Sequence, residues 1–531
     1  MLLLTAGLFG QISSLRQYYL VTRGLPGGQY TEAELGHIKL INPILPESSV
    51  STDVTRLVFS GLTRYNPQGV IEPDLATSWS ISPDGRSYTF NLRHDVKWHD
   101  GVPFTARDVA FTITAIQNPD TRSPLSPSWL NVKADTKDDY TVVLSLPNPN
   151  APFINSTTFG ILPAHILEAS DPSSLRIASF NQKPVGTGPF KVKNFAAAEG
   201  EIELEANSDY YGGRPKLDGF SFKMYDNYDQ MLDAYAKRQV NGISRWRPEE
   251  SASKRTLANL KQSQLSLPDQ TDLFLRTTSG TLADKAVRQA LVKATDRNQI
   301  INVALDQQAL PLASPLLPGQ VGYSPLYRQA SFDQDAAASL LANAGWSKDS
   351  NGLLTKNGEQ LKLRLVTLDS GQYPKVADLV KKQWAALGIG VDVKTADLAT
   401  LQQTYIRARN YDVLLYGINI GADPDVYVYW HSSQASDPGL NLSQYSSAVA
   451  DKALESARLS SDDDVRTGKY HTFLQTWTDD APAIVLYQPT YIYAYNNNLL
   501  GLKAHRLIDP ADRFYGVERW TIRTSQVARG S

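Results

Sequence analysis

The chain has 531 residues, more than one hydrophobic core usually covers, so we expect two or three domains. Its net charge of −2 does not provide the basic surface that attracts nucleic acids or anionic membranes, so we expect no nucleic acid partner. The absence of cysteine excludes disulfides, thiolate metal sites, a cysteine nucleophile and attachment of a lipid through an N-terminal cysteine.

The N-terminus begins with an apolar run, MLLLTAGLFG, and continues as a glycine-containing linker up to Gly36. A secretory signal would place basic residues before such a run and a small-residue cleavage site after it, and neither is present. The run is too short to span the ~30 Å of a bilayer core. It is therefore either a frayed helix or the outer half of a membrane anchor that begins upstream. We expect residues 1–35 to be this segment and its linker.

The next part of the chain is rich in hairpin signals. His37–Ile44 is expected to be the first strand, and the turn SPDG lies between later strands. In YTFNLR, the alternating residues Tyr88, Phe90 and Leu92 share one face of a strand. Thr105 and Asp108 are spaced as a capping box, which predicts that a helix begins there.

The stretch YTFNLRHDVKWHDG contains two of the seven histidines, His94 and His99. A zinc site needs three or four converging ligands, and no third histidine or cysteine lies near them in sequence. The other histidines are scattered singly, without a His-Glu-x-x-His helix. We therefore predict that this stretch has an architectural role, and we expect no metal site and no cofactor.

The second half of the chain has a different pattern. Residues 284–305 form an amphipathic helix pair, and a hairpin is expected about Asn357 and Gly358. A helix in residues 375–389 then joins two strands, and a crossover of this length implies parallel pairing. Residues from about Leu273 to Asp480 are therefore predicted to be a separate α/β domain.

No catalytic motif is present. There is no Gly-x-Ser-x-Gly elbow, and PVGTGPFKV lacks the lysine of a phosphate loop and the third glycine of a dinucleotide fingerprint. The segment 411–434, a strand followed by a glycine-containing loop and aromatic residues, has the features of a ligand wall, although aromatics at alternate positions are equally typical of a core. Trp246 lies between two arginines. We interpret this segment as a pocket wall beside a hinge in preference to a surface turn.

Several longer motifs occur in a fixed order from about Gly36 to the C-terminus: DLATSWSISPDGRSYTFNLRHDVKWHDGVPFTARDVAFTI, PVGTGPFKV, ANSDYYGGRPKLDGFSF, AVRQALVKATDRNQII, LLANAGW and DDAPAIVLYQPTYIYAY. In this combination the chain resembles the family 5 extracellular solute-binding proteins, the peptide-, dipeptide- and nickel-binding components of ABC importers. The resemblance implies that the chain is not an enzyme.

The resemblance implies an α/β fold, a two-lobed periplasmic-binding-protein-like clamp (type II, cluster C) with an additional β-rich subdomain in lobe one. The implied boundaries are 36–269 for lobe one with the subdomain at about 65–184, 270–480 for lobe two, and 481–531 for a C-terminal return to lobe one. The implied partners are a small solute, most simply a peptide, and ABC permease subunits. The chain would be an extracytoplasmic monomer, tethered by an N-terminal membrane segment.

By position, the resemblance also implies a set of ligand-binding residues: Glu47, Ser48, Ser49, Trp129, Ser244, Arg245, Trp246, Asp269, Thr271, Tyr416, Asp423 and Tyr427. One departure matters. Peptide-binding members place an aspartate where this chain has Ile420, and Asp423 could replace it as the partner of a peptide amine. Alternatives are therefore a non-peptide solute such as a nickel complex or a sugar, a peptide-sensing or chaperone-like receptor without transport, and an enzyme built on the same clamp.

Overall fold

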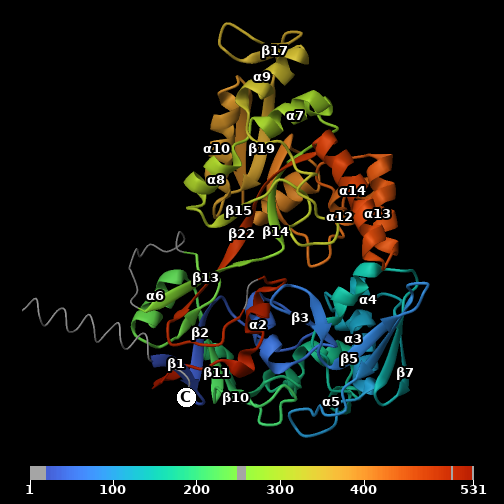
Figure 1. Cartoon of the computed structure of the whole chain (residues 1–531), viewed down its shortest axis with the longest axis vertical. Coiled ribbons are helices and arrows are strands. Elements are labelled where there is room, and N and C mark those ends of the chain that lie inside the picture. The colour runs from blue at the N-terminus through green and yellow to red at the C-terminus, as the bar shows by residue number, and fades with distance from the viewer. Residues whose placement is uncertain (1–19, 248–258, 504–505, 529–531) are drawn as a thin grey trace, which may run out of the picture.

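The computed structural model describes residues 20–247, 259–503 and 506–528. It has two lobes, one above the other in Figure 1, and both combine helices with strands of one extended sheet. The strand order of this sheet is β20-β19-β21-β14-β22-β12-β2-β11-β10-β9, and β13 and β15 also pair with β22. The predicted α/β clamp with two lobes is confirmed.

Lobe one is built on a mixed sheet in which β2 pairs in parallel with β11 and β12. Helix α2 begins at a capping box on Ser48 and buries its apolar residues in the core of this lobe. The elements are β2 (Gln29–Leu35), α2 (Ser49–Val58), β9 (Phe190–Ala196), β10 (Glu201–Ala206), β11 (Gly219–Tyr225), α6 (Tyr228–Ala236), β12 (Gly242–Ile243) and β13 (Leu260–Ser266).

A β-rich subdomain lies beside this sheet, at the lower right of Figure 1. Its four strands are antiparallel in the order β5-β6-β8-β7, and Tyr88 and Phe90 are fully buried on the predicted face. Thr105 is the N-cap of α3, with the capping box that its spacing to Asp108 predicted. The elements are β3 (Thr63–Tyr65), β4 (Ile71–Pro73), β5 (Ala76–Ile81), β6 (Ser87–Leu92), α3 (Ala106–Gln117), α4 (Ser126–Trp129), β7 (Lys133–Asp138), β8 (Thr141–Ser145) and α5 (Ala164–Leu167).

Lobe two contains the predicted helix pair and the predicted parallel crossover, in which β19 pairs in parallel with β20. Asn357 and Gly358 both have positive φ at the turn between β17 and β18, as expected. The elements are β14 (Asp269–Leu275), α7 (Lys285–Lys293), α8 (Arg297–Ala304), β15 (Ala309–Pro311), α9 (Gln334–Asn343), β16 (Ser347–Lys348), β17 (Leu354–Lys356), β18 (Glu359–Gln360), β19 (Lys362–Leu368), α10 (Tyr373–Ala385), β20 (Gly390–Ala396), α11 (Leu398–Thr400), β21 (Val413–Asn419), α12 (Tyr427–Trp430), α13 (Ala448–Leu459) and α14 (Asp463–Asp480).

Two chain segments cross between the lobes. The long strand β22 (Ala483–Asn496) pairs with β14 and β15 through its first half and with β12 and β13 through its second half. The second crossing is the short connection at Leu267 and Pro268, between β13 and β14. In the described part of the chain, these two crossings join the sheets of the two lobes, so the lobes are linked as in a hinged clamp.

The expected start of the ordered fold is wrong. Residues assigned to a linker form β1 (Leu20–Leu25) and the central strand β2, whereas His37–Ile44 is not a strand. The pattern of β2 was hidden because its buried positions include Glu32 and Glu34, whose charges are balanced by distant arginines.

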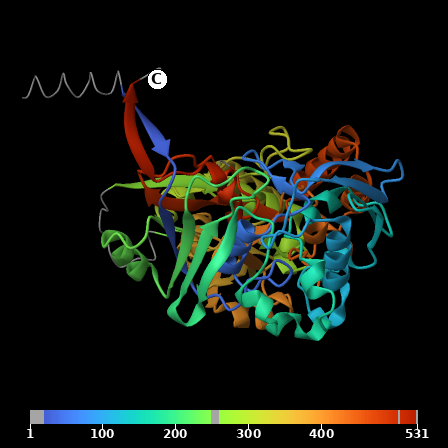
Figure 2. The same ribbon diagram turned by 90° about the horizontal axis from the view of Figure 1, so that it is seen from below.

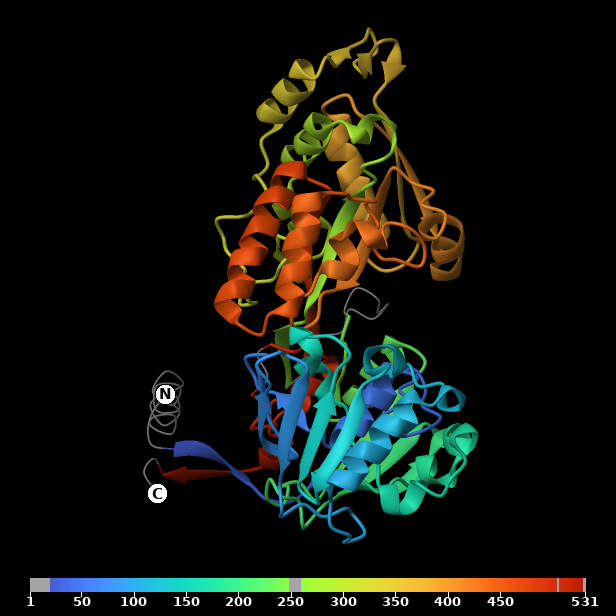
Figure 3. The ribbon, with the colours of Figure 1, turned by 90° about the vertical axis from the view of Figure 1, so that its right-hand side faces the viewer.

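Strand β1 pairs with β23 (Arg523–Ala528) in a two-stranded ribbon that extends away from the body of lobe one (Figures 2 and 3). None of the helices in the described ranges 20–247, 259–503 and 506–528 has the length and apolar character needed to cross a membrane. The apolar run at residues 1–10 lies outside the described residues.

Candidate functional site

A cavity of about 450 Å³ lies where the two lobes meet, and we call it the seam cavity. Lobe two contributes the first residues of β14, the last residues of β21 and the N-terminal end of α10, whereas lobe one contributes Trp246 and Arg247. Tyr487 of the crossing strand β22 also lines it. Ends of strands that open into a crevice are the usual position of ligands in α/β folds.

Neutral polar groups are prominent in this cavity. Gln270 is fully buried and donates from Nε2 to the Asp272 carboxylate, while its Oε1 atom has no hydrogen-bond partner among the described residues. The same holds for Trp246 Nε1 and Gln372 Oε1. Buried polar atoms are nearly always paired in folded proteins, so these three atoms are polar groups that lack a protein partner beside the cavity.

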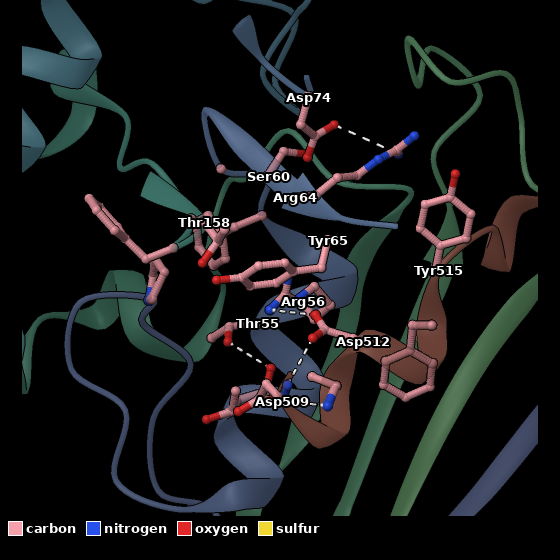
Figure 4. A pocket seen from close by; sticks show the side chains of 18 of the residues that line it. Thr55, Arg56, Ser60, Arg64, Tyr65, Asp74, Thr158, Asp509, Asp512 and Tyr515 are labelled. Atoms are coloured by element: carbon pink, nitrogen blue, oxygen red, sulfur yellow. Dashed lines mark hydrogen bonds and ion pairs between the residues drawn. The ribbon is translucent and has the colours of Figure 1, made fainter. Parts of the chain in front are cut away.

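A second cavity, of about 560 Å³, lies in lobe one and reaches Asn419 of lobe two, which also lines the seam cavity. Figure 4 shows its charged groups, Arg56 from α2 and Asp512 from the C-terminal segment, joined at 3.2 Å. Arg64 and Asp74 face each other at 3.8 Å on the opposite side. The two cavities therefore meet at Asn419.

Behind the cleft, lobe one contains a buried ionic cluster, defined by Glu32, Glu34, Asp53, Arg245 and Arg513. Arg513 is fully buried and pairs with all three carboxylates, and Arg245 pairs with Glu34 at 3.1 Å and Asp53 at 2.8 Å. Burial raises the pKa of Glu34 well above its ordinary value; for Asp53 the two arginines outweigh burial and lower the pKa. The cluster fixes the turn that leads to Trp246.

Of the predicted ligand residues, Trp246, Asp269 and Thr271 line the seam cavity. Tyr416 lies in β21 one residue before the lining segment, and its half-buried ring packs against the core of lobe two. Ser244 is fully buried and donates to Glu34 at 2.5 Å, which places it with Arg245 behind the wall.

The predicted residues near α2 and α4 lie elsewhere. Glu47 pairs with Arg176 at 2.5 Å, Ser48 caps α2, and Ser49 is the first residue of that helix. Trp129 is 1% exposed and packs edge-on against aromatic rings of the subdomain core, so its indole does not form a cleft wall.

Asp423 and Tyr427 are engaged within lobe two. The Asp423 carboxylate accepts a hydrogen bond from Arg466 at 2.5 Å, and Arg466 is only 4% exposed. Tyr427 stacks on His431 and lies under the guanidinium of Arg458. Neither residue lines the seam cavity or the lobe-one cavity.

Sequence reasoning missed the wall residues Arg247, Gln372 and Tyr373, and also the charged groups of the lobe-one cavity. A usable signal existed for Gln372 and Tyr373, because they lie in the short connection from β19 to α10 and at the start of that helix, beyond the carboxyl end of a parallel strand. No local signal marks Asp509 or Asp512, which reach the cavity from the far end of the chain.

The histidines of the hairpin have structural contacts. His99 Nδ1 accepts from the Gly186 backbone N–H at 3.2 Å, and its Nε2 lies 3.0 Å from the Gly188 carbonyl oxygen. His94 stacks on Tyr140. Among the described residues, no three His, Cys, Asp or Glu side chains are grouped so that they could hold a metal ion.

Two α/β lobes, a hinge of crossing strands and walls contributed from both sides define a binding protein of the clamp class. The model of bacterial extracellular solute-binding proteins, family 5, middle region, matches residues 70–439. The chain belongs to this family.

Known proteins are similar to this chain over nearly its whole length. The oligopeptide-binding protein AppA of Bacillus subtilis is 30% identical over 514 residues, covering 93% of this chain and 91% of AppA. The solved structure of that protein with a nonapeptide has a TM-score of 0.71 and is 28% identical in sequence. The match covers 94% of this chain and 100% of the AppA chain. The structure of NikZ from Campylobacter jejuni with Ni(L-His) has a TM-score of 0.74 and is 27% identical in sequence. The match covers 93% of this chain and 99% of the NikZ chain.

Proposed function

We propose that this chain captures a peptide, or a similarly extended small solute, between its lobes and delivers it to an ABC-type import permease. The observation that carries the proposal is the seam cavity, to which both lobes and the crossing strand contribute. A ligand that touches both lobes favours the closed clamp because it binds that state more tightly. The name of the relative AppA supports a peptide as the ligand.

The composition of the cavity also supports an extended polar ligand. Its walls combine aromatic rings, such as Trp246 and Tyr373, with neutral hydrogen-bonding groups such as Gln270. Such walls hold a ligand through its backbone amides and tolerate varied side chains. We keep Trp246, Asp269 and Thr271 as proposed ligand contacts.

We further infer that the chain acts as an extracytoplasmic monomer and is not an enzyme. Membership of an extracellular solute-binding family supports the location and the binding role. A tether through its N-terminal apolar run remains part of this proposal. Fractionation of cells that express the protein from its native locus tests it: recovery in the washed membrane fraction is expected. Release of the whole population as soluble protein would contradict a tether.

Binding is tested by incubating the purified protein with a mixture of short synthetic peptides and identifying what remains bound by native mass spectrometry. We expect peptides to be retained and to stabilise the fold, by about 2.7 kcal/mol at a hundredfold excess over the Kd. A nickel–histidine complex is the comparison arm, because NikZ was solved with it. Stabilisation by that complex alone would replace peptide with a metal chelate as the ligand.

A further inference from the structure

Lobe two has a further pocket, of about 700 Å³, outside the cleft between the lobes. It is lined by the C-terminal half of α7, the segment 326–330, α9 and the C-terminal end of α14, and we call it the helix pocket. Helices α7 and α9 lie in the upper part of lobe two, away from lobe one (Figure 1). None of its described lining residues lines the seam cavity or the lobe-one cavity, so a ligand held in the cleft would leave this pocket free.

Much of the wall of the helix pocket is apolar. Val292 and Ala481 belong to the core of lobe two, and Leu340 packs against that core. Leu326 also lines the pocket, and its side chain is 86% exposed. An apolar group that enters would remove water from these side chains, which favours its binding.

The wall formed by residues 326–330 is fixed to the rest of lobe two. Gln329 is 3% exposed, and its Nε2 donates to the carbonyl oxygen of Ala483 on the crossing strand β22, at 2.6 Å. Arg297 Nη1 donates to the carbonyl oxygen of Ala330 at 3.2 Å. The pocket is therefore preformed, and a ligand does not have to order this segment when it binds.

Two cationic side chains line the helix pocket without a carboxylate partner. Across the described ranges of the chain, Lys293 and Arg328 form no ion pair with an aspartate or glutamate. Asp479 is the acid among the described lining residues, and it pairs with Lys285, which also pairs with Asp480 at 3.3 Å. Because Lys285 balances the nearby acids, the two unpaired cations give the pocket a positive charge.

We propose that the helix pocket binds a small amphipathic anion, an apolar chain or ring that carries a carboxylate. The apolar body packs against Val292, Leu326 and Leu340, and the carboxylate meets Lys293 and Arg328. Both side chains donate charged hydrogen bonds to carboxylates, and arginine can do so through two parallel bonds. The inference goes beyond capture of a solute between the lobes, because it assigns a second ligand that binds outside the cleft.

The test uses phenylbutyrate as the anionic probe and its neutral amide, phenylbutanamide, as the matched comparison. Isothermal titration calorimetry measures binding of each probe to the full chain. We expect the carboxylate to bind about tenfold more tightly than the amide, because the amide has the same apolar body without the charge.

Two variants assign the charge preference to the pocket. Lys293→Gln and Arg328→Gln should each weaken binding of phenylbutyrate about three- to tenfold and leave the affinity for the amide unchanged. Ala330→Trp adds a large ring at an exposed position of the wall and should abolish binding of both probes. Lys382→Gln, which removes an exposed lysine of α10, is the matched control and should behave as wild type.

Several outcomes would overturn the proposal. Failure of wild-type protein to bind phenylbutyrate, or equal affinity for the two probes, would exclude an anion site. Unchanged affinity in both Lys293→Gln and Arg328→Gln would place the anion elsewhere on the molecule. Should Lys293→Gln fail to fold, Arg328→Gln decides alone, because Arg328 is exposed. Capture of peptides by the same preparations is measured separately, so failure of this inference is distinguishable from failure of the proposed function.

Discussion

At the scale of single residues, the buried ionic cluster is the arrangement with the highest cost of removing charges from water. Arg513 is fully buried, and it comes from the C-terminal segment to meet Glu32 and Glu34 on β2. Ionised groups are costly to remove from water, and this cost is offset only when every charge has a partner. Arg513 therefore fixes the C-terminal segment to the central strand of lobe one.

Arg513→Met should lower the free energy of unfolding by about 3–5 kcal/mol, since it leaves the buried Glu32 without its arginine and leaves Glu34 and Asp53 with Arg245 alone. Urea unfolding followed by circular dichroism measures the loss. Arg519→Met is the matched control, because Arg519 is half exposed and its pair with Glu518 should contribute less than about 1 kcal/mol. Equal, small losses for both variants would show that the cluster does not hold this lobe together.

His99 predicts a pH dependence of stability. Its ring accepts a hydrogen bond from Gly186 through Nδ1, which requires the neutral form, and burial lowers the pKa of His99 to about 4. Because this is below the unfolded value of about 6.5, the stabilisation is complete above pH 6.5 and is lost as the pH falls towards 4. We expect up to roughly 3 kcal/mol of loss from this group. His99→Gln should flatten the unfolding free energy across this window; an unchanged slope would contradict the assignment.

At the scale of secondary structure elements, local signals were sufficient where the partners were close in sequence. The cap of α3, the helix pair α7 and α8, and the parallel pairing of β19 with β20 were all predicted correctly. Strand β2 was missed because its glutamates are balanced by Arg513, 479–481 residues away. No window along the chain contains that information. The lobe boundaries drawn from the resemblance stay a prediction.

The candidate site shows the same limit. Trp246, Asp269 and Thr271 follow or begin strands near the hinge, and the structure places them in the seam cavity. Trp129 had the same appearance in sequence, a tryptophan at the end of a turn, but Phe153 and Phe159 enclose it in the core. Whether an aromatic residue lines a cleft or fills a core depends on tertiary packing, which the local pattern does not contain.

Asp108 joins two helices of the subdomain, α3 and α5. Its carboxylate accepts from the backbone N–H of Thr105 at the start of α3 and from that of Ala164 at the start of α5, each at 2.9 Å. Asp108→Ala leaves both donors unpaired in a buried place, so we expect a loss of about 2 kcal/mol in unfolding free energy. Thermal unfolding measures this loss, and Asp120→Ala, a substitution of an exposed aspartate, is the control. A loss no larger than that of the control would mean that water replaces the carboxylate.

At the scale of the whole molecule, the lobes touch outside the hinge. Arg506 of the C-terminal segment donates from Nη1 to the carbonyl oxygen of Pro318 in lobe two, at 3.1 Å. Its side chain passes between Gly69 and Gly319, where a Cβ atom would lie 3.1 Å and 2.9 Å from it. Burial lowers the pKa of Arg506, and no carboxylate of the described residues pairs with it, so this contact depends on the lobes being close.

Arg506→Gln should therefore shift the unliganded protein towards more open conformations, because it removes a hydrogen bond that exists only when Pro318 is near. A loss of roughly 1 kcal/mol corresponds to a several-fold change in the ratio of closed to open states, and ligand dissociation should accelerate by a similar factor. Small-angle scattering should give a larger radius of gyration for the unliganded variant, and saturation with the captured peptide should bring it back to the wild-type closed value.

Arg519→Gln, in the same segment but away from lobe two, controls for loss of charge. Identical scattering and dissociation rates for Arg506→Gln and wild type would show that the strands of the hinge alone set the closure.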